Sequence, residues 1–136
     1  MAKLTAQEAL IYIMVVTSAA DETISSRELR LISDIVSRLP VFEGFDMERL
    51  DALVAECCTY LENANGIEHI LNITQAALSK KLQDTAYALA VEVAACGLDV
   101  KQEELVFLQL LADRWELENL TVAAIERSAR IRYRKG

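Results

Sequence analysis

Two segments of the chain are apolar on nearly every side of the helix that each would form. Residues 6–19 contain an unbroken apolar run from Ala9 to Val16, and residues 82–96 hold a second run that only Glu92 interrupts. A helix without a polar face is stable only when other elements surround it. The pattern therefore predicts two buried central helices, which cross near the middle of the fold.

Five further segments repeat apolar residues every three or four positions, which indicates helices with one buried face. Ser25 with Glu28, like Thr5 with Glu8 before the first helix, forms a capping-box pattern, and Asp46 and Asn119 are the expected N-caps of later helices. The five segments are 26–39, 46–61, 67–78, 101–116 and 120–133. Their expected buried stripes include Leu29, Ile32, Ile35, Val36 and Leu39 in the first, Met47, Leu50, Leu53, Val54, Cys57 and Leu61 in the second, and Leu105, Leu108, Leu111, Ala112 and Trp115 in the fourth.

The pattern of residues 11–32 recurs at residues 86–108. Tyr12 aligns with Tyr87, Val16 with Val91, and Ala19-Ala20 with Ala94-Ala95; after one inserted residue, Glu28-Leu29 aligns with Glu104-Leu105. Two copies are too few for a solenoid. The sequence predicts an all-α, compact seven-helix bundle in one domain over residues 1–136, with a duplicated helix-turn-helix hairpin at about 5–39 and 82–117.

The C-terminal end of the chain is basic, whereas the rest of the sequence is acidic. The chain has a formal net charge of −7, yet its last ten positions (127–136) hold five of its 14 basic residues and no acid. The other 126 residues carry 9 basic and 21 acidic groups, a net of −12. Such a body repels nucleic acid and favours cations or basic partners. Arg127, Arg130 and Arg134 are candidates for contact with an acidic partner or an anionic membrane surface, and the alternative is that they complement the dipole of a final helix.

Composition adds little chemistry. Three cysteines without metal-ligand spacing fit a reducing cytoplasm, the first residues do not resemble a signal peptide, and no apolar run is long enough to span a membrane. No catalytic motif is present. We therefore expect a cytoplasmic, non-enzymatic protein that binds protein partners and has no required cofactor, and the sequence does not give its oligomeric state.

The segment A-A-D-x-x-I-S-x-x-E at residues 19–28, with its second copy, resembles the tellurite-resistance TerB-like family over about residues 5–132. The resemblance implies a cytoplasmic all-helical domain with internal duplication and shortened, EF-hand-like acidic turns. It also implies a stress-response role as a metal-sensing or interaction module near membranes, without enzymatic activity. In that family the turn usually reads A-D-G, whereas this chain has Glu22 in place of the Gly and Cys96 in place of the second Asp.

The acidic turns are the candidate metal site. If the two turns lie close together, six carboxylates are available for a hard cation such as Ca²⁺ or Mg²⁺: Asp21, Glu22, Glu28, Glu92, Asp99 and Glu104. A true EF-hand loop is absent. Glu28 and Asp99 have the alternative of capping the helices that follow them, and Glu92 has the alternative of pairing with an arginine. We expect at most weak binding, because the Cys96 thiol suits a hard cation poorly.

Other polar and aromatic residues favour structural roles. Cys57 and Cys58 are adjacent on a helix and diverge by about 100°, so they do not form a redox pair. His69 has no recognisable catalytic partners, and Phe42 and Phe45 are expected either to cover the core or to offer an apolar patch. The sequence thus favours an interaction or regulatory domain, with a membrane-surface adaptor as the alternative.

Overall fold

The computed structural model describes residues 4–19, 24–96 and 102–136. Within these ranges it has seven α-helices, two short 3₁₀ turns and no strand, so the predicted all-α class is confirmed. The helices are α1 (Ala6–Ala19), α2 (Ser26–Arg38), α3 (Leu50–Leu61), α4 (Gly66–Ala77), α5 (Lys80–Ala95), α6 (Gln102–Arg114) and α7 (Asn119–Arg132), and the turns η1 (Pro40–Phe42) and η2 (Met47–Arg49) join α2 to α3.

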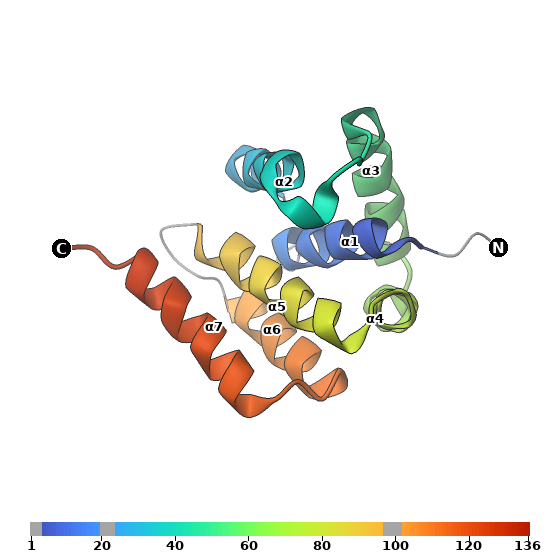
Figure 1. The fold of residues 1–136 in the computed structure, drawn as a ribbon. Helices are drawn as coiled ribbons and strands as arrows, with labels where there is room; N and C mark the ends of the chain where they lie inside the picture. The colour runs from blue at the N-terminus through green and yellow to red at the C-terminus, as the bar shows by residue number, and fades with distance from the viewer. Residues whose placement is uncertain (1–3, 20–23, 97–101) are drawn as a thin grey trace.

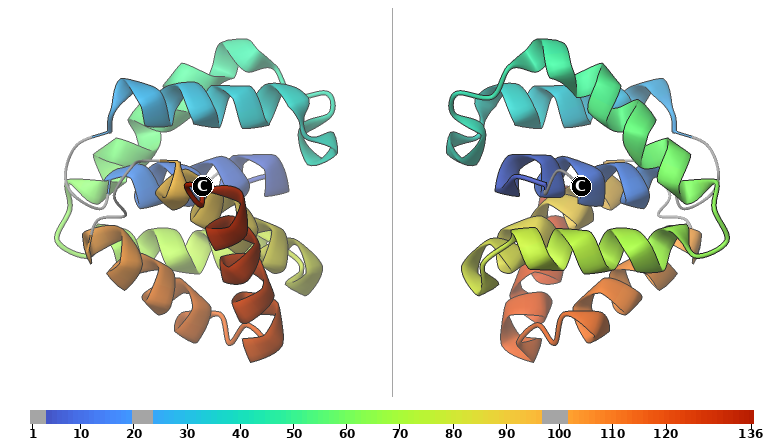
Figure 2. Two further views of the ribbon diagram at one scale, coloured as in Figure 1. Left: turned by 90° about the vertical axis from the view of Figure 1, so that its left-hand side faces the viewer. Right: turned by 90° about the vertical axis from the view of Figure 1, so that its right-hand side faces the viewer.

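Helix α1 lies in the middle of the bundle. Figures 1 and 2 show α2 and α3 on one side of it and α4, α6 and α7 on the other, with α5 packed against it. Every α1 residue from Glu8 to Ser18 is buried. The predicted packing and burial of the two apolar helices are confirmed, with Leu10 and Met14 of α1 and Leu89 and Val93 of α5 all buried. Burying a helix on all sides removes its whole apolar surface from water, at roughly 25 cal/mol per Å².

Local capping sets where the first two helices begin. The Thr5 hydroxyl accepts from the Glu8 N–H at 3.1 Å, and the Glu8 carboxylate accepts from the Thr5 N–H at 2.8 Å. Ser25 and Glu28 form the same reciprocal pair at α2. Each box satisfies backbone N–H groups that the first turn of a helix leaves free. Both predicted capping boxes are confirmed.

Some sequence expectations about individual positions are wrong. Asp46, the expected N-cap of the third helix, caps the short turn η2, and α3 begins only at Leu50. Asn119 is the first residue of α7 and not its N-cap, because the extended backbone of Glu118 (φ −65°, ψ 133°) takes that place without a side-chain cap. Leu29, Met47 and Leu105, expected in buried stripes, are 41%, 38% and 49% exposed. Leu29 and Leu105 lie in the first turns of α2 and α6, whereas the fully buried apolar residues of these helices begin about one turn later, at Ile32 and Phe107. An apolar residue at the outer end of a helix is thus beyond the reach of the central helices.

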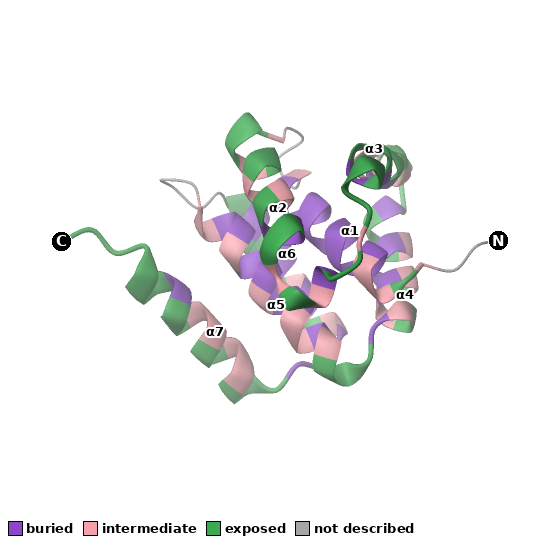
Figure 3. Cartoon of the chain, turned by 45° about the horizontal axis from the view of Figure 1, so that its top comes forward, coloured by how far each residue is buried: buried purple, intermediate pink, exposed green. Residues whose placement is uncertain are grey.

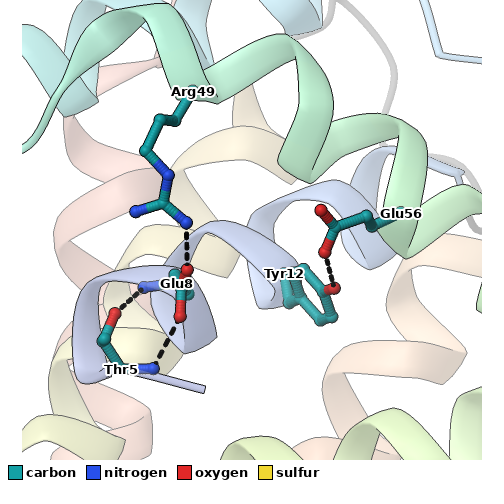
Figure 4. Close-up of polar contacts among 5 residues, drawn as sticks. All are labelled: Thr5, Glu8, Tyr12, Arg49 and Glu56. Atoms are coloured by element: carbon teal, nitrogen blue, oxygen red, sulfur yellow. Dashed lines mark hydrogen bonds and ion pairs between the residues drawn. The ribbon is translucent and has the colours of Figure 1, made fainter. Parts of the chain in front are cut away.

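Two tyrosine–glutamate hydrogen bonds tie outer helices to central ones. The Tyr12 hydroxyl on α1 donates to Glu56 on α3 at 3.3 Å, as Figure 4 shows beside the Thr5–Glu8–Arg49 contacts. The Tyr87 hydroxyl on α5 donates to Glu126 on α7 at 2.6 Å. These are the two tyrosines that the sequence repeat aligns. Each therefore joins an outer helix, α3 or α7, to a central one.

Candidate functional site

A groove of about 680 Å³ lies where α6 and α7 cover α5. Its buried lining comes from small and branched apolar residues, among them Val91, Ala94, Leu108 and Ala129. Leu105 and Tyr133 also line it, and at 49% and 43% exposure they keep it open to solvent. The full lining is Val91, Ala94, Ala95, Leu105, Leu108, Gln109, Glu126, Arg127, Ala129, Arg130, Tyr133 and Arg134.

Arg127, Arg130 and Arg134 give this groove a basic edge. All three line the groove and are exposed. The steps of three and four residues between them place residues of a helix on one face; Arg127 and Arg130 lie within α7, and Arg134 follows its end. Among the residues that the structure describes, none of the three forms an ion pair with the chain's own acids. The edge is therefore a row of unneutralised guanidinium groups beside an apolar floor.

Helix α7 is held in place by both apolar and polar contacts, with Val122 and Ile125 partly buried against the core. Only Ala129 of α7 is buried, and Figure 3 shows the helix as mostly exposed or intermediate. Besides the Tyr87–Glu126 hydrogen bond, Glu92 of α5 accepts from both the Arg132 guanidinium and the Tyr133 hydroxyl. Burial, together with the hydrogen bond and charge of Glu92, raises the pKa of Tyr133 to about 12. These contacts hold the C-terminal part of α7 against α5.

Glu92 is thus a structural anchor. Its carboxylate binds Arg132 and Tyr133, in keeping with the pairing alternative that the sequence left open. Arg132 differs in this respect from its neighbours Arg130 and Arg134, because its guanidinium group pairs with a carboxylate of the same chain. The sequence could not identify this pair, since 40 residues separate its members.

The remaining candidate metal ligands are only partly described. Asp21, Glu22 and Asp99 lie outside the described residues. Glu28 is part of its capping box, and Glu104 is buried near the start of α6. Burial, followed by the nearby carboxylates of Glu28 and Glu104, raises the pKa of the Cys96 thiol, so one acid from each repeat acts on the same side chain. Within the described ranges, no three His, Cys, Asp or Glu residues are grouped to hold a metal ion.

The other residues singled out from the sequence have structural surroundings. Cys57 is buried and its thiol donates to the Tyr12 carbonyl at 3.7 Å; burial raises its pKa well above the ordinary value. The His69 ring packs on Tyr60 with centroids 5.0 Å apart. Phe42 is buried, and Phe45 meets it edge to face at 6.4 Å, as expected of residues that cover the core. Trp115 is buried as predicted.

The sequence found the three arginines but missed the groove. Leu105 was assigned to the core, and nothing in the spacing of α6 and α7 shows that they diverge over α5. The available signal was the cluster of Arg127, Arg130, Tyr133 and Arg134 at the end of the last helix.

In the described part of the chain, no helix combines the length and the apolar content needed to cross a lipid bilayer. No protein-family model matches the sequence, and no curated protein or solved structure matches it either.

Proposed function

We propose that this chain is a non-enzymatic interaction domain, and that the α5–α6–α7 groove is its binding face for an acidic partner. The observation that carries the proposal is the row of Arg127, Arg130 and Arg134 along an apolar floor, exposed and without ion pairs to any described residue. A chain with 21 acidic and 14 basic residues offers many carboxylates for pairing. Arginines left unpaired beside an apolar groove are suited to carboxylates of another molecule, since guanidinium groups bind them with two parallel hydrogen bonds.

Electrostatics favours a small acidic target over nucleic acid. The three arginines are local, whereas the rest of the chain outside the last ten residues carries a net charge of −12. A long polyanion crossing the groove meets repulsion from that acidic surface, while a short acidic segment meets only the basic edge. The charge pattern therefore favours a partner whose charged stretch is short as well as acidic.

The lining of the groove does not favour catalysis. Its one carboxylate, Glu126, already accepts the Tyr87 hydroxyl, and neither Glu92 nor His69 lines it. Proton transfer and nucleophilic attack need an available base or nucleophile at the substrate. Binding is the chemistry that arginines and aliphatic side chains supply.

The wider biological setting is proposed from the resemblance to TerB-like domains. That resemblance supports a stress-response role and an internal duplication. The duplication has further support in the matched pair of Tyr12–Glu56 and Tyr87–Glu126, which extends it from two helices to three in each half. The weak divalent-cation site at the acidic turns likewise stays a prediction from sequence.

Fluorescence anisotropy with labelled hexaglutamate at low salt tests the proposed binding face. The variant Arg127→Glu/Arg130→Glu should bind about tenfold more weakly, because two exposed charge pairs contribute roughly 0.5–1 kcal/mol each. The matched control is Arg30→Glu/Lys81→Glu, which changes the net charge by the same amount at exposed positions outside the groove. Equal weakening in both variants, or none in either, would mean that the groove is not the binding face.

A further inference from the structure

We infer, on the basis of the proposed function, that the occupant of the groove is an amphipathic helix with an acidic flank beside an apolar stripe. The proposed function states where an acidic partner binds, whereas this inference states what shape and sequence pattern the partner has. Three properties of the groove lead to it: the backbone chemistry of its walls, the size of its floor residues and the spacing of its arginines.

The walls of the groove are α5, α6 and α7, with no strand in the described residues. An extended peptide brings unpaired backbone N–H and C=O groups, and it is bound well where a sheet edge can pair with them. Helical walls have no such edge to offer. A helix satisfies its own backbone hydrogen bonds and can place apolar side chains on the floor at no such cost.

The floor is built to receive large side chains. Ala94, Ala95 and Ala129 line it, and small residues let another helix approach closely. Leu105 at the mouth, with half of its surface exposed, adds apolar area that no neighbour covers. A small ligand has most of its surface buried in its site, whereas the exposed residues at the mouth of this groove favour a larger occupant. A helix with its own solvent-facing side fits the groove better.

The arginines fix the partner's acidic pattern. From Arg127 to Arg130 α7 advances about 4.5 Å at 1.5 Å per residue, and Arg134 lies two residues beyond the end of the helix. A partner helix lying along α7 therefore matches Arg127 and Arg130 with acids at positions i and i+3 or i+4, and Arg134 extends the basic edge beyond the helix. Its leucine-like residues occupy the adjacent stripe and face the alanine floor. A flat bilayer surface presents the anionic groups but cannot enter the floor between α6 and α7.

The test uses two designed 18-residue peptides of one composition: one with leucines in a helical stripe and glutamates flanking it, the other scrambled. The stripe peptide should bind at least about tenfold more tightly, by anisotropy, and should gain helicity by circular dichroism. The variant Arg127→Glu/Arg130→Glu should no longer bind the stripe peptide with glutamates. It should instead bind a stripe peptide in which lysines replace the glutamates. Leu105→Ser should weaken binding of the stripe peptide more than it weakens binding of hexaglutamate, whereas Leu120→Ser, at a residue 77% exposed and outside the groove lining, should affect neither.

The outcomes separate the two proposals. If hexaglutamate binds through the arginines but the stripe peptide is no better than its scramble, the helix inference is wrong and the acidic binding face stands. If neither peptide nor hexaglutamate depends on Arg127 and Arg130, both proposals are wrong. If vesicles of phosphatidylcholine with phosphatidylserine bind through these arginines while the peptides do not, the occupant is a membrane surface, which also overturns the inference.

Discussion

Met14 lies in the middle of α1 and has no exposed surface. Replacing it with alanine removes a flexible side chain from a site enclosed by several helices, and the cavity left behind adds to the lost transfer free energy. We predict that Met14→Ala lowers the free energy of unfolding by about 2–5 kcal/mol, measured by urea denaturation. A loss below about 0.5 kcal/mol would show that the site collapses freely or is not part of the core.

Glu8 joins local capping to a long-range ion pair. Burial alone opposes its ionisation, but the Thr5 N–H and the Arg49 guanidinium outweigh burial and hold the pKa of Glu8 below its ordinary value of 4.5 (Figure 4). A carboxyl group whose pKa is lowered by folding stabilises the fold above its unfolded pKa, and this contribution is lost as the pH falls through the folded value.

The variant Glu8→Gln keeps a hydrogen-bond acceptor for Thr5 but removes the charge. It should therefore be less stable than the parent at pH 7, by about 1 kcal/mol or less because Arg49 is half exposed. The difference should shrink once the pH falls below about 4.5 and vanish under the folded pKa. Urea unfolding of both proteins from pH 7 to pH 3 measures it, and a difference that does not change with pH would contradict the charge-based explanation.

At the residue scale, the sequence could predict contacts that span three positions and not those that span forty. The Thr5–Glu8 and Ser25–Glu28 boxes each join two residues that are three positions apart in the sequence. The Glu8–Arg49 and Glu92–Arg132 pairs depend on how helices pack. For Glu92 the sequence therefore left two roles open, a metal ligand or the partner of an arginine. Only the packing of the helices distinguishes them.

At the scale of elements, each Tyr–Glu hydrogen bond should control the attachment of one outer helix. Removing the Tyr87 hydroxyl leaves Glu126 without its donor, and a hydrogen bond to a charged group contributes about 1.5–3 kcal/mol when it is not solvated. We predict that Tyr87→Phe increases amide hydrogen exchange in α7 and leaves α1–α4 unchanged. Tyr12→Phe should act on α3 instead, and a uniform increase across all helices in both variants would rule out this division of roles.

Helix positions were largely predictable because the governing signals are local. Apolar periodicity, capping boxes and Pro40 placed six of the seven described helices within about two residues of those observed. The third, expected from Asp46, begins only at Leu50 because residues 47–49 form the turn η2. The exposed Leu29 and Leu105 were not predictable in the same way, since their spacing matches that of core residues. Whether a first-turn leucine is covered depends on how far the neighbouring helix extends.

At the scale of the whole molecule, the predicted cation site concerns the acidic turns. Binding only to the native state raises the melting temperature by linkage. We predict a small upward shift in melting temperature with several millimolar Ca²⁺ or Mg²⁺. The shift is small because the expected affinity is on the order of that of the loosest calcium modules. Asp21→Asn/Asp99→Asn should abolish that shift. No shift in the parent protein, or an equal shift in the variant, would show that the acidic turns do not form a cation site.

The distribution of charge was visible in the sequence, but the groove was not, because it depends on the divergence of α6 and α7 over α5. The central claim is that this groove is where an acidic partner binds. Amide NMR shifts during titration with unlabelled hexaglutamate test it most directly. We expect the largest shifts at residues 91–95, 105–109 and 126–134. Shifts spread over the surface, or concentrated on α2 and α3, would show that hexaglutamate does not bind in the groove.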